Sequence, residues 1–168
     1  MSHFSGTELT DAFTAFLAEV DDLHKAGQWE RFADLFTDDV VYIEHAFGRF
    51  TTREQVRDWS VKTMTSFPGN HMTEFPPLWY LVDEERGRIV AEVDNPMRDP
   101  GDGSVHTATN ISIYTYAGDG KWSGEEDVYN PMEFAQMAMR WCERAQELGT
   151  LTDEARTWMD KMRKVLPR

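Results

Sequence analysis

Cysteine is almost absent from the sequence: Cys142 is the only one in 168 residues. A single cysteine cannot form an intrachain disulfide, and such scarcity is typical of chains that work in a reducing cytoplasm. Cys142 lies at helical spacing among apolar residues, namely Met137, Ala138, Trp141 and Ala145. This spacing favours a small core residue over a reactive thiol. We therefore expect a cytoplasmic protein without disulfides.

Positive charge and long apolar runs are also scarce. Seventeen Lys and Arg residues stand against 30 Asp and Glu residues, which gives a formal net charge of −13. Such a chain repels phosphate backbones and anionic lipid surfaces, so we expect no nucleic-acid partner. No segment reaches the length of apolar sequence that spans a bilayer, and residues 1–6 have no basic region followed by an apolar run. We expect no membrane association.

The chain has enough apolar side chains for one core, since 40% of its residues are hydrophobic and 12% are aromatic. We interpret residues 1–168 as a single domain. Hydrophobic periodicity predicts helices at 9–26, 29–36 and 52–64, with a short strand at 40–43 between the last two. After Pro76 and Pro77 the period changes to two, which predicts strands at 79–82, 88–97, 105–116 and 121–129.

Two further helices follow the strands. Asn130 can cap the first of them, with Pro131 at its first position, and the second begins at Thr152. Helices, then consecutive strands, then helices again predict an α+β domain. We expect a curved antiparallel sheet covered by helices on one side, with extra C-terminal helices.

Acidic residues alternate along the strand 89–95, whose sequence is IVAEVDN. Because residues two apart in a strand share a face, Glu92 and Asp94 point together and Ile89, Ala91 and Val93 point the other way. The same reasoning gives every other strand a polar face, made of Tyr42, Glu44, Asn110, Ser112, Tyr114, Glu125, Asp127 and Tyr129. A half-solvated antiparallel sheet produces this alternation without any function.

Aromatic faces on the helices favour a second interpretation, in which the polar face is covered. The aromatic residues concerned are Phe13, Phe16, Trp59, Phe67, Phe134 and Trp141. If these helices cover the polar side of the sheet, they enclose an apolar-walled cavity with converging acids at its floor. That is the usual construction of a small-molecule site.

Two stretches resemble the NTF2-like superfamily, which includes ketosteroid isomerases, limonene-epoxide hydrolases, scytalone dehydratases and SnoaL-type polyketide cyclases. Residues 26–42 read AGQWERFADLFTDDVVY, and residues 116–131 read YAGDGKWSGEEDVYNP. The resemblance covers the chain from about residue 10 to 145. It implies a cone-shaped sheet whose polar face lines a pocket and whose dry outer face packs against a second subunit. We therefore expect a homodimer.

The resemblance also implies candidate catalytic residues. Tyr42 and Glu44 match the Tyr-x-Asn of the epoxide hydrolases, with Glu in place of Asn, and Asp127 matches a later Asp. Glu92 and Asp94 match an Arg-x-Asp pattern, but Glu92 stands where those enzymes have the cation, and Arg98 is the candidate replacement. These departures put ordinary epoxide hydrolysis in doubt.

Comparison with the other relatives is less complete. Glu44 falls on the catalytic Asp position of the ketosteroid isomerases, but their oxyanion-binding Tyr and Asp positions fall on Val20 and Ser112. His71 can be compared with the catalytic histidine of the dehydratases, but an exposed histidine or one that packs in a loop is the preferred interpretation. The substrate-binding candidates are Trp59, Phe16, Asn110, Ser112, Tyr129 and His71.

Several acids in one cavity cannot all ionise there without partners, so at least one is expected to hold a proton near neutrality. A neutral acid beside an ionised one provides a general acid and a general base. We expect an acid–base enzyme that needs no cofactor or metal and acts on a small lipophilic molecule of steroid, terpenoid or polyketide size. Three alternatives remain: a divalent cation held by the carboxylates, acids that only pair with Arg98, Lys121 or tyrosines, and a non-catalytic binding domain.

Overall fold

The computed structural model describes residues 4–165. Its N-terminal helices follow local sequence signals, as expected. Helix α1 (Gly6–Ala26) is capped by Ser5 and ends at Gly27, which adopts the left-handed conformation with φ 66°. The second expected helix is the 3₁₀ helix η1 (Trp29–Leu35). Helix α2 (Arg53–Met64) begins where Thr52 accepts a hydrogen bond from the Gln55 amide.

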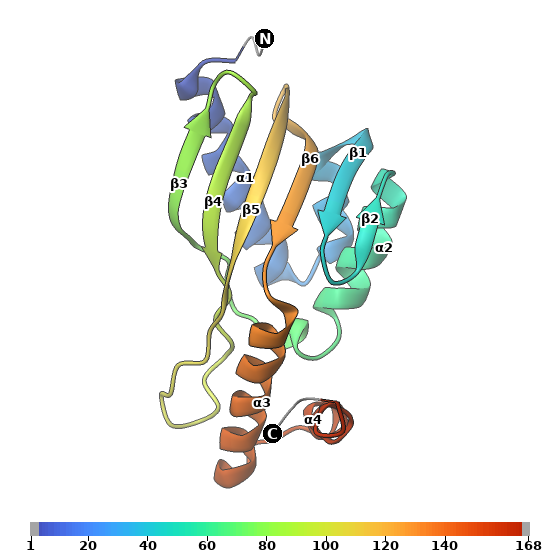
Figure 1. The fold of residues 1–168 in the computed structure, drawn as a ribbon, viewed down its shortest axis with the longest axis vertical. Coiled ribbons are helices and arrows are strands. Elements are labelled where there is room, and N and C mark those ends of the chain that lie inside the picture. The colour runs from blue at the N-terminus through green and yellow to red at the C-terminus, as the bar shows by residue number, and fades with distance from the viewer. Residues whose placement is uncertain (1–3, 166–168) are drawn as a thin grey trace.

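Six strands form one curved sheet in the order β2-β1-β6-β5-β4-β3 (Figure 1). Their bounds are β1 (Phe36–Glu44), β2 (Gly48–Phe50), β3 (Pro77–Asp83), β4 (Arg88–Asp94), β5 (Thr109–Gly118) and β6 (Lys121–Val128). The sheet is mixed, because β1 pairs with β6 in parallel. The expectation of a wholly antiparallel sheet is therefore wrong, since alternation within a strand carries no information on the direction of its neighbour.

Helices cover one face of the sheet and enclose the main core. Figure 1 shows α1 and α2 on the same side of the strands. The core there is aromatic: Phe13 and Phe16 of α1 pack against Tyr114 of β5 and Trp122 of β6, with ring centroids 5.1–6.3 Å apart. The helix-covered face of the sheet is therefore its concave, packed face.

The C-terminal helices build a second core beyond the end of the sheet. Helix α3 (Pro131–Leu148) follows β6, with Asn130 as its cap, and α4 (Asp153–Met162) packs against it (Figure 1). Met137, Trp141 and Met159 are fully buried there with Phe67, which lies near the short 3₁₀ helix η2 (Gly69–His71). The expected C-terminal helices are thus present and add a separate hydrophobic cluster.

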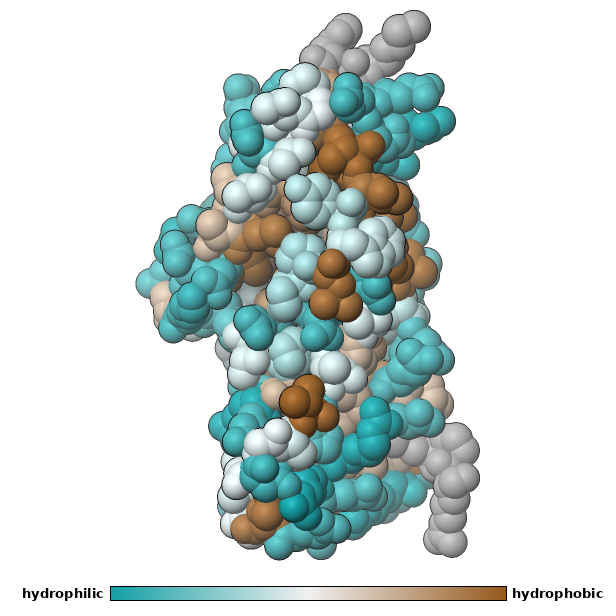
Figure 2. Space-filling model, turned by 90° about the vertical axis from the view of Figure 1, so that its left-hand side faces the viewer, coloured by the Kyte–Doolittle hydropathy of each residue, from teal (hydrophilic) through white to brown (hydrophobic). Residues whose placement is uncertain are grey.

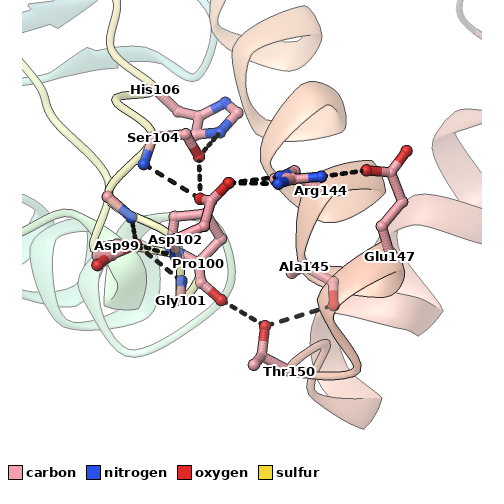
Figure 3. Close-up of polar contacts among 11 residues, drawn as sticks. Asp99, Pro100, Gly101, Asp102, Ser104, His106, Arg144, Ala145, Glu147 and Thr150 are labelled. Carbon is pink, nitrogen blue, oxygen red and sulfur yellow. Dashed lines mark hydrogen bonds and ion pairs between the residues drawn. The ribbon is translucent and has the colours of Figure 1, made fainter.

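The loop before β5 is tied to α3 by polar contacts (Figure 3). The Asp102 carboxylate accepts hydrogen bonds from Arg144 and from Ser104, and the Thr150 hydroxyl donates to the Pro100 carbonyl. Asp99 accepts from three backbone N–H groups of the same loop. Because these bonds hold the loop on the helix, β5 begins at Thr109 and not at the expected residue 105.

The register of β4 overturns the expected orientation of IVAEVDN. Ala91 lies opposite Ser112, and Ser112 lies opposite Asp127, so these three residues share the concave face. Glu92 lies opposite Ile111 and points to the outer face, and Asp94 points the same way. The side chains of Ile89, Ala91 and Val93 instead fill the core. The prediction that Glu92 and Asp94 share the face of Asp127 is therefore wrong.

Partners on the outer side satisfy both acids. The indole Nε1 of Trp79 donates to Glu92 Oε2 at 2.5 Å, and the Thr107 hydroxyl donates to Asp94 Oδ1. The physical reason for the wrong prediction is that the helices present apolar surface to this end of the sheet. In β4 the buried face is therefore the apolar one, whereas in β1, β5 and β6 it is polar.

The outer face of the sheet and the β3 edge expose apolar side chains. Leu78 and Leu81 are 57% and 64% exposed, and Trp79, Tyr80 and Val128 are also exposed. Figure 2, which faces the β3 side of the molecule, shows brown hydrophobic atoms at the surface there. Within residues 4–165 we find no helix that is both long and apolar enough to cross a membrane.

Candidate functional site

A cavity of about 890 Å³ lies between the concave face of the sheet and the helices. Its walls are mainly apolar and aromatic, and they include Phe16, Trp29, Phe32, Phe50, Trp59, Phe67, Phe134 and Trp158. The sheet contributes a polar floor, made of Tyr42, Glu44, Asn95, Asn110, Ser112, Tyr114, Glu125, Asp127 and Tyr129. The space is therefore an apolar chamber with hydrogen-bonding groups on one side.

Asp127 of β6 lies at the centre of a network of neutral donors. The Tyr42 hydroxyl donates to Asp127 Oδ2 at 2.6 Å, and the Ser112 hydroxyl donates to Oδ1 at 2.5 Å. The Asn110 amide donates to the same Oδ1 at 3.3 Å. Two strands, β1 and β5, thus supply three donors to one carboxylate, and hydrogen bonds of this kind favour its ionised form.

Glu44 at the end of β1 is a second buried carboxylate with its partners in place. The Tyr129 hydroxyl donates to Oε1, while the backbone N–H groups of Ala46 and Phe47 donate to Oε2 at 2.8 and 2.7 Å. Both oxygens therefore hold the turn after β1 and the end of β6. Glu44 is positioned to support the site, and its lone pairs are largely occupied.

Glu125, unlike Glu44, has a carboxyl oxygen without a hydrogen-bond partner. It is only 6% exposed, and its Oε2 atom is buried without a hydrogen-bond partner. Burial and the negative charge of Asp127 raise the pKa of Glu125 well above its ordinary value, while a hydrogen bond with Tyr42 acts in the other direction. Removal from water favours the neutral form of Glu125, so the site favours the protonated carboxylic acid there.

In Asp127 the hydrogen-bond donors offset part of the effect of burial on the pKa. Burial raises the pKa of Asp127 to about 6, with Ser112 and Tyr42 lowering it and the charge of Glu44 raising it. The carboxyl is therefore mostly ionised at neutral pH. Burial is also the main cause that raises the pKa values of Tyr42 and Tyr114, which stay protonated as donors. The floor of the cavity thus favours the neutral form of one acid, Glu125, two residues before a second acid, Asp127, whose donors favour the anion.

Cations take no direct part in the floor. Within residues 4–165, no lysine or arginine forms an ion pair with Glu44, Glu125 or Asp127. Arg98, the expected replacement cation, lies over the Trp141 ring at 5.7 Å in the second core. The same described residues contain no group of three or more His, Cys, Asp or Glu side chains arranged to hold a metal ion.

The structure brings most of the predicted site residues together. Those that line the cavity are Tyr42, Glu44, Asp127, Trp59, Phe16, Asn110, Ser112 and Tyr129. Glu92 and Asp94 lie on the outer face, as described above. His71 also lies outside the cavity, between the rings of Phe67 and Trp141 at 4.9 Å from each, and burial lowers its pKa to about 4. Its expected position at the substrate is therefore wrong, and a packed loop histidine describes it.

Sequence reasoning missed Glu125 and Asn95 as site residues. Alternation placed Glu125 on the same polar face as Asp127 and Tyr129, but it did not show which acid on that face lacks a hydrogen-bond partner, so Glu125 was not chosen as a site residue. Asn95 ends the stretch IVAEVDN and lies on the same face as Val93. Assigning β4 by its cross-strand partners would have identified Asn95 in place of Asp94.

Comparisons with known structures agree with this architecture. An LEH-like epoxide hydrolase from M. tuberculosis aligns with a TM-score of 0.61 at 13% identity, over 87% of this chain and 95% of that one. A hypothetical protein with a ketosteroid isomerase-like fold from Catenulispora acidiphila, in complex with trimethylamine, gives 0.58 at 16%, over 75% and 90%. A putative polyketide cyclase from Xanthomonas campestris gives 0.56 at 16%, over 77% and 96%. At such identities the likeness shows the shared NTF2-like fold.

The SnoaL-like domain model matches residues 9–125 of the sequence. The chain therefore belongs to the SnoaL-like family. A search of curated proteins finds no match. The family match ends at Glu125, so Asp127, Tyr129 and both C-terminal helices lie beyond it.

The burial of Glu125 predicts a specific pH dependence of stability. Below its ordinary pKa of 4.5, Glu125 is neutral in both the folded and the unfolded chain. As the pH rises, the unfolded chain loses this proton first, so the folded protein loses stability. Glu125→Gln removes the effect, and we expect its melting temperature to exceed that of the wild type by about 2–4 °C near neutral pH.

Thermal unfolding across the acidic to neutral range measures this difference. The gain should vanish below the ordinary pKa of glutamic acid. Glu126→Gln, at the next position on the outer face, is the matched control and should give no gain that grows with pH. An equal melting temperature for Glu125→Gln and the wild type at every pH would show that Glu125 is not held as a neutral acid.

Proposed function

We propose that this protein is a cofactor-independent acid–base enzyme that acts on a small lipophilic molecule in the cavity. The observation that supports this most is the contrast between Glu125 and Asp127. One has a buried oxygen without a partner, and the other accepts three hydrogen bonds from neutral donors. Two carboxyl groups with opposite protonation states are what concerted proton transfer needs.

In this proposal Asp127 is the general base and Glu125 is the general acid. Asp127 takes a proton from a substrate carbon or from a water molecule, and Glu125 gives its proton to a substrate oxygen. Tyr42 stays hydrogen-bonded to Asp127 and keeps its carboxylate aimed at the cavity. In an isomerisation the two protons return during the second half of the reaction, so both residues end in their starting states.

The cavity also supports a class of substrate. Its aromatic walls suit a compact apolar body of steroid, terpenoid or polyketide size. Its floor carries three carboxyl groups without a basic partner, so an anionic group would be repelled there. The reacting end of the substrate is accordingly an uncharged oxygen, such as a carbonyl or an epoxide, that accepts the proton of Glu125.

A non-catalytic ligand-binding domain is the second candidate. The observation that favours it is the size and aromatic character of the cavity, which would hold a lipophilic ligand without any chemistry. The two candidates differ in whether they require the buried carboxyl groups on the cavity floor. A binding protein gains nothing from a strained pair of acids, because uncompensated burial of carboxyl groups costs stability.

Substitution of the two acids tests the enzyme against the binding protein. On a panel of lipophilic ketones and epoxides, Asp127→Asn and Glu125→Gln should each lower kcat/KM by about 10²–10⁴-fold, because each loses one proton-transfer group. Both variants should stay folded and keep ligand affinity. Glu92→Gln and Asp94→Asn, with their side chains on the outer face, are the controls and should turn over normally. Binding without turnover by the wild type across the panel would favour the binding domain.

We also propose that two copies of the chain associate through the outer face of the sheet. That face carries apolar residues from four strands, namely Val41, Ile43, Val90, Ile111, Ile113 and Val128, with Trp79 and Leu81 beside them. Contiguous exposed apolar surface of this kind marks association sites, and twofold pairing of one face is the commonest form.

Sedimentation velocity measures this association. The wild type should sediment as a dimer, and Ile113→Glu should shift it to the monomer because it places a charge in the middle of the face. Val105→Glu changes another exposed apolar residue, in the loop before β5, and should leave the dimer intact. A monomeric wild type at micromolar concentration would contradict the proposal.

We place this activity in the cytoplasm. Cys142 is a buried free thiol, and burial raises its pKa to about 12, so it is an unreactive core residue. A chain without disulfides suits a reducing compartment.

A further inference from the structure

The side-chain nitrogen of Asn95, at the end of β4, has three hydrogen-bond acceptors around it. It is only 7% exposed, and its side-chain nitrogen lies 3.1 Å from the Val93 carbonyl oxygen and 3.2 Å from that of Ala108. The same nitrogen lies 2.8 Å from Asn110 Oδ1. Asn95 therefore connects fixed backbone groups at the end of β4 to a side chain at the floor of the cavity.

The two backbone carbonyls determine which way the Asn95 amide points. A carbonyl oxygen only accepts hydrogen bonds, so the atom of Asn95 that faces Val93 and Ala108 must be the NH₂ group. That NH₂ group in turn requires an acceptor on Asn110, which turns Asn110 Oδ1 towards Asn95. The amide of Asn110 then has one remaining orientation, with its own NH₂ group directed at Ser112 and Asp127.

The order of donors continues to the carboxylate. Asn110 Nδ2 donates to Ser112 Oγ at 2.7 Å and to Asp127 Oδ1 at 3.3 Å. Because the Ser112 oxygen accepts from Asn110, its own proton is free for Asp127, which it reaches at 2.5 Å. The Asn95 protons therefore point towards the two backbone carbonyls and Asn110 Oδ1, whereas the protons of Asn110 and Ser112 point towards Asp127.

We propose that Asn95 is a positioning residue of the acid–base site, which orients the amide of Asn110 and the hydroxyl of Ser112 so that both donate to Asp127. The use of this positioning in catalysis rests on the proposed function. The orientation of the donors does not, because it is a property of the protein without substrate. Without Asn95, the Asn110 amide can rotate and present its oxygen to Ser112, which would then donate to Asn110 and leave Asp127 with fewer donors.

Other charged and titratable groups around Asp127 do not depend on Asn95. From β1 these are Tyr42 and Glu44, with His45 on the other face, from β5 Tyr114, and from β6 Glu125 and Tyr129. Arg49 of β2 and Asp58 and Lys62 of α2 line the same cavity. A change at Asn95 therefore alters the donors on Asp127 while these groups stay in place.

Carbon-13 NMR titration of the aspartate carboxyl groups tests the role, with the Asp127 signal assigned by its loss in Asp127→Asn. In Asn95→Ser the hydroxyl can still donate to a local carbonyl but is too short to reach Asn110. We expect the titration midpoint of Asp127 to rise by about one pH unit, the effect of weakening one hydrogen bond to a charged group. Ser112→Ala removes the last donor of the series and should raise it similarly.

Two further comparisons separate positioning from general loosening of the fold. In Asn95→Ser combined with Ser112→Ala the shift should be smaller than the sum of the single shifts, because both changes act on the same hydrogen bond. Asp94→Asn changes the preceding residue, whose side chain points to the outer face, and should leave the Asp127 midpoint unchanged.

An Asp127 midpoint in Asn95→Ser equal to that of the wild type would overturn the proposal. Fully additive shifts in the double variant would do the same. Because the titration needs no substrate, these outcomes do not depend on whether the protein proves to be an enzyme. If Asn95→Ser does not fold, Asn95→Leu provides the same comparison with the side-chain volume kept.

Discussion

The site depends on the hydrogen bonds that keep Asp127 ionised in an apolar cavity. Burial of a carboxylate costs free energy, and the protein offsets part of that cost with neutral donors from Tyr42, Asn110 and Ser112. A lysine or arginine in their place would stabilise the anion more strongly but would also make it a weaker base. Glu125 lacks such donors on Oε2, and burial raises its pKa well above the ordinary value. The difference between the two acids is therefore a difference in donors, since both are removed from water.

The topology of the sheet makes this arrangement possible. Tyr42 and Asp127 are separated by 85 positions in the sequence, and they meet because β1 lies parallel to β6. The same pairing places Glu44 opposite Asp127, and Tyr129 reaches Glu44 from the end of β6. The first and last strands along the chain thus lie side by side in the sheet and carry Tyr42, Glu44 and Asp127 of the site, while α1 and α2 cover the cavity (Figure 1).

Local signals in the sequence predicted much of the fold. Thr52, Asn130 and Thr152 lie at helix starts as expected, because capping depends only on residues within one turn. Resemblance to a known superfamily gave the curved sheet and its helical cover. The direction of β1 beside β6 and the start of β5 could not be read in the same way, because they depend on partners far away in the sequence.

The face of the sheet that lines the cavity was predicted correctly on three strands and wrongly on β4. Alternation divides a strand into two faces, but only cross-strand register says which face is buried. In β1, β5 and β6 the polar face is the covered one, and Asp127 and its donors were identified. In β4 the apolar face is covered, so Glu92 and Asp94 were assigned to the cavity in error, and Asn95 was overlooked. Glu125 was placed on the polar face but not chosen as a site residue, because alternation does not show that its Oε2 atom lacks a hydrogen-bond partner.

The most direct test of this account is a carbon-13 NMR titration of the Glu125 and Asp127 carboxyl groups in the wild-type protein. We predict that Glu125 is still protonated at neutral pH, while Asp127 titrates with a midpoint of about 6. The account would be contradicted if both groups titrated near the ordinary values of 4.5 and 3.8, because the cavity floor would then hold two similar anions and no general acid.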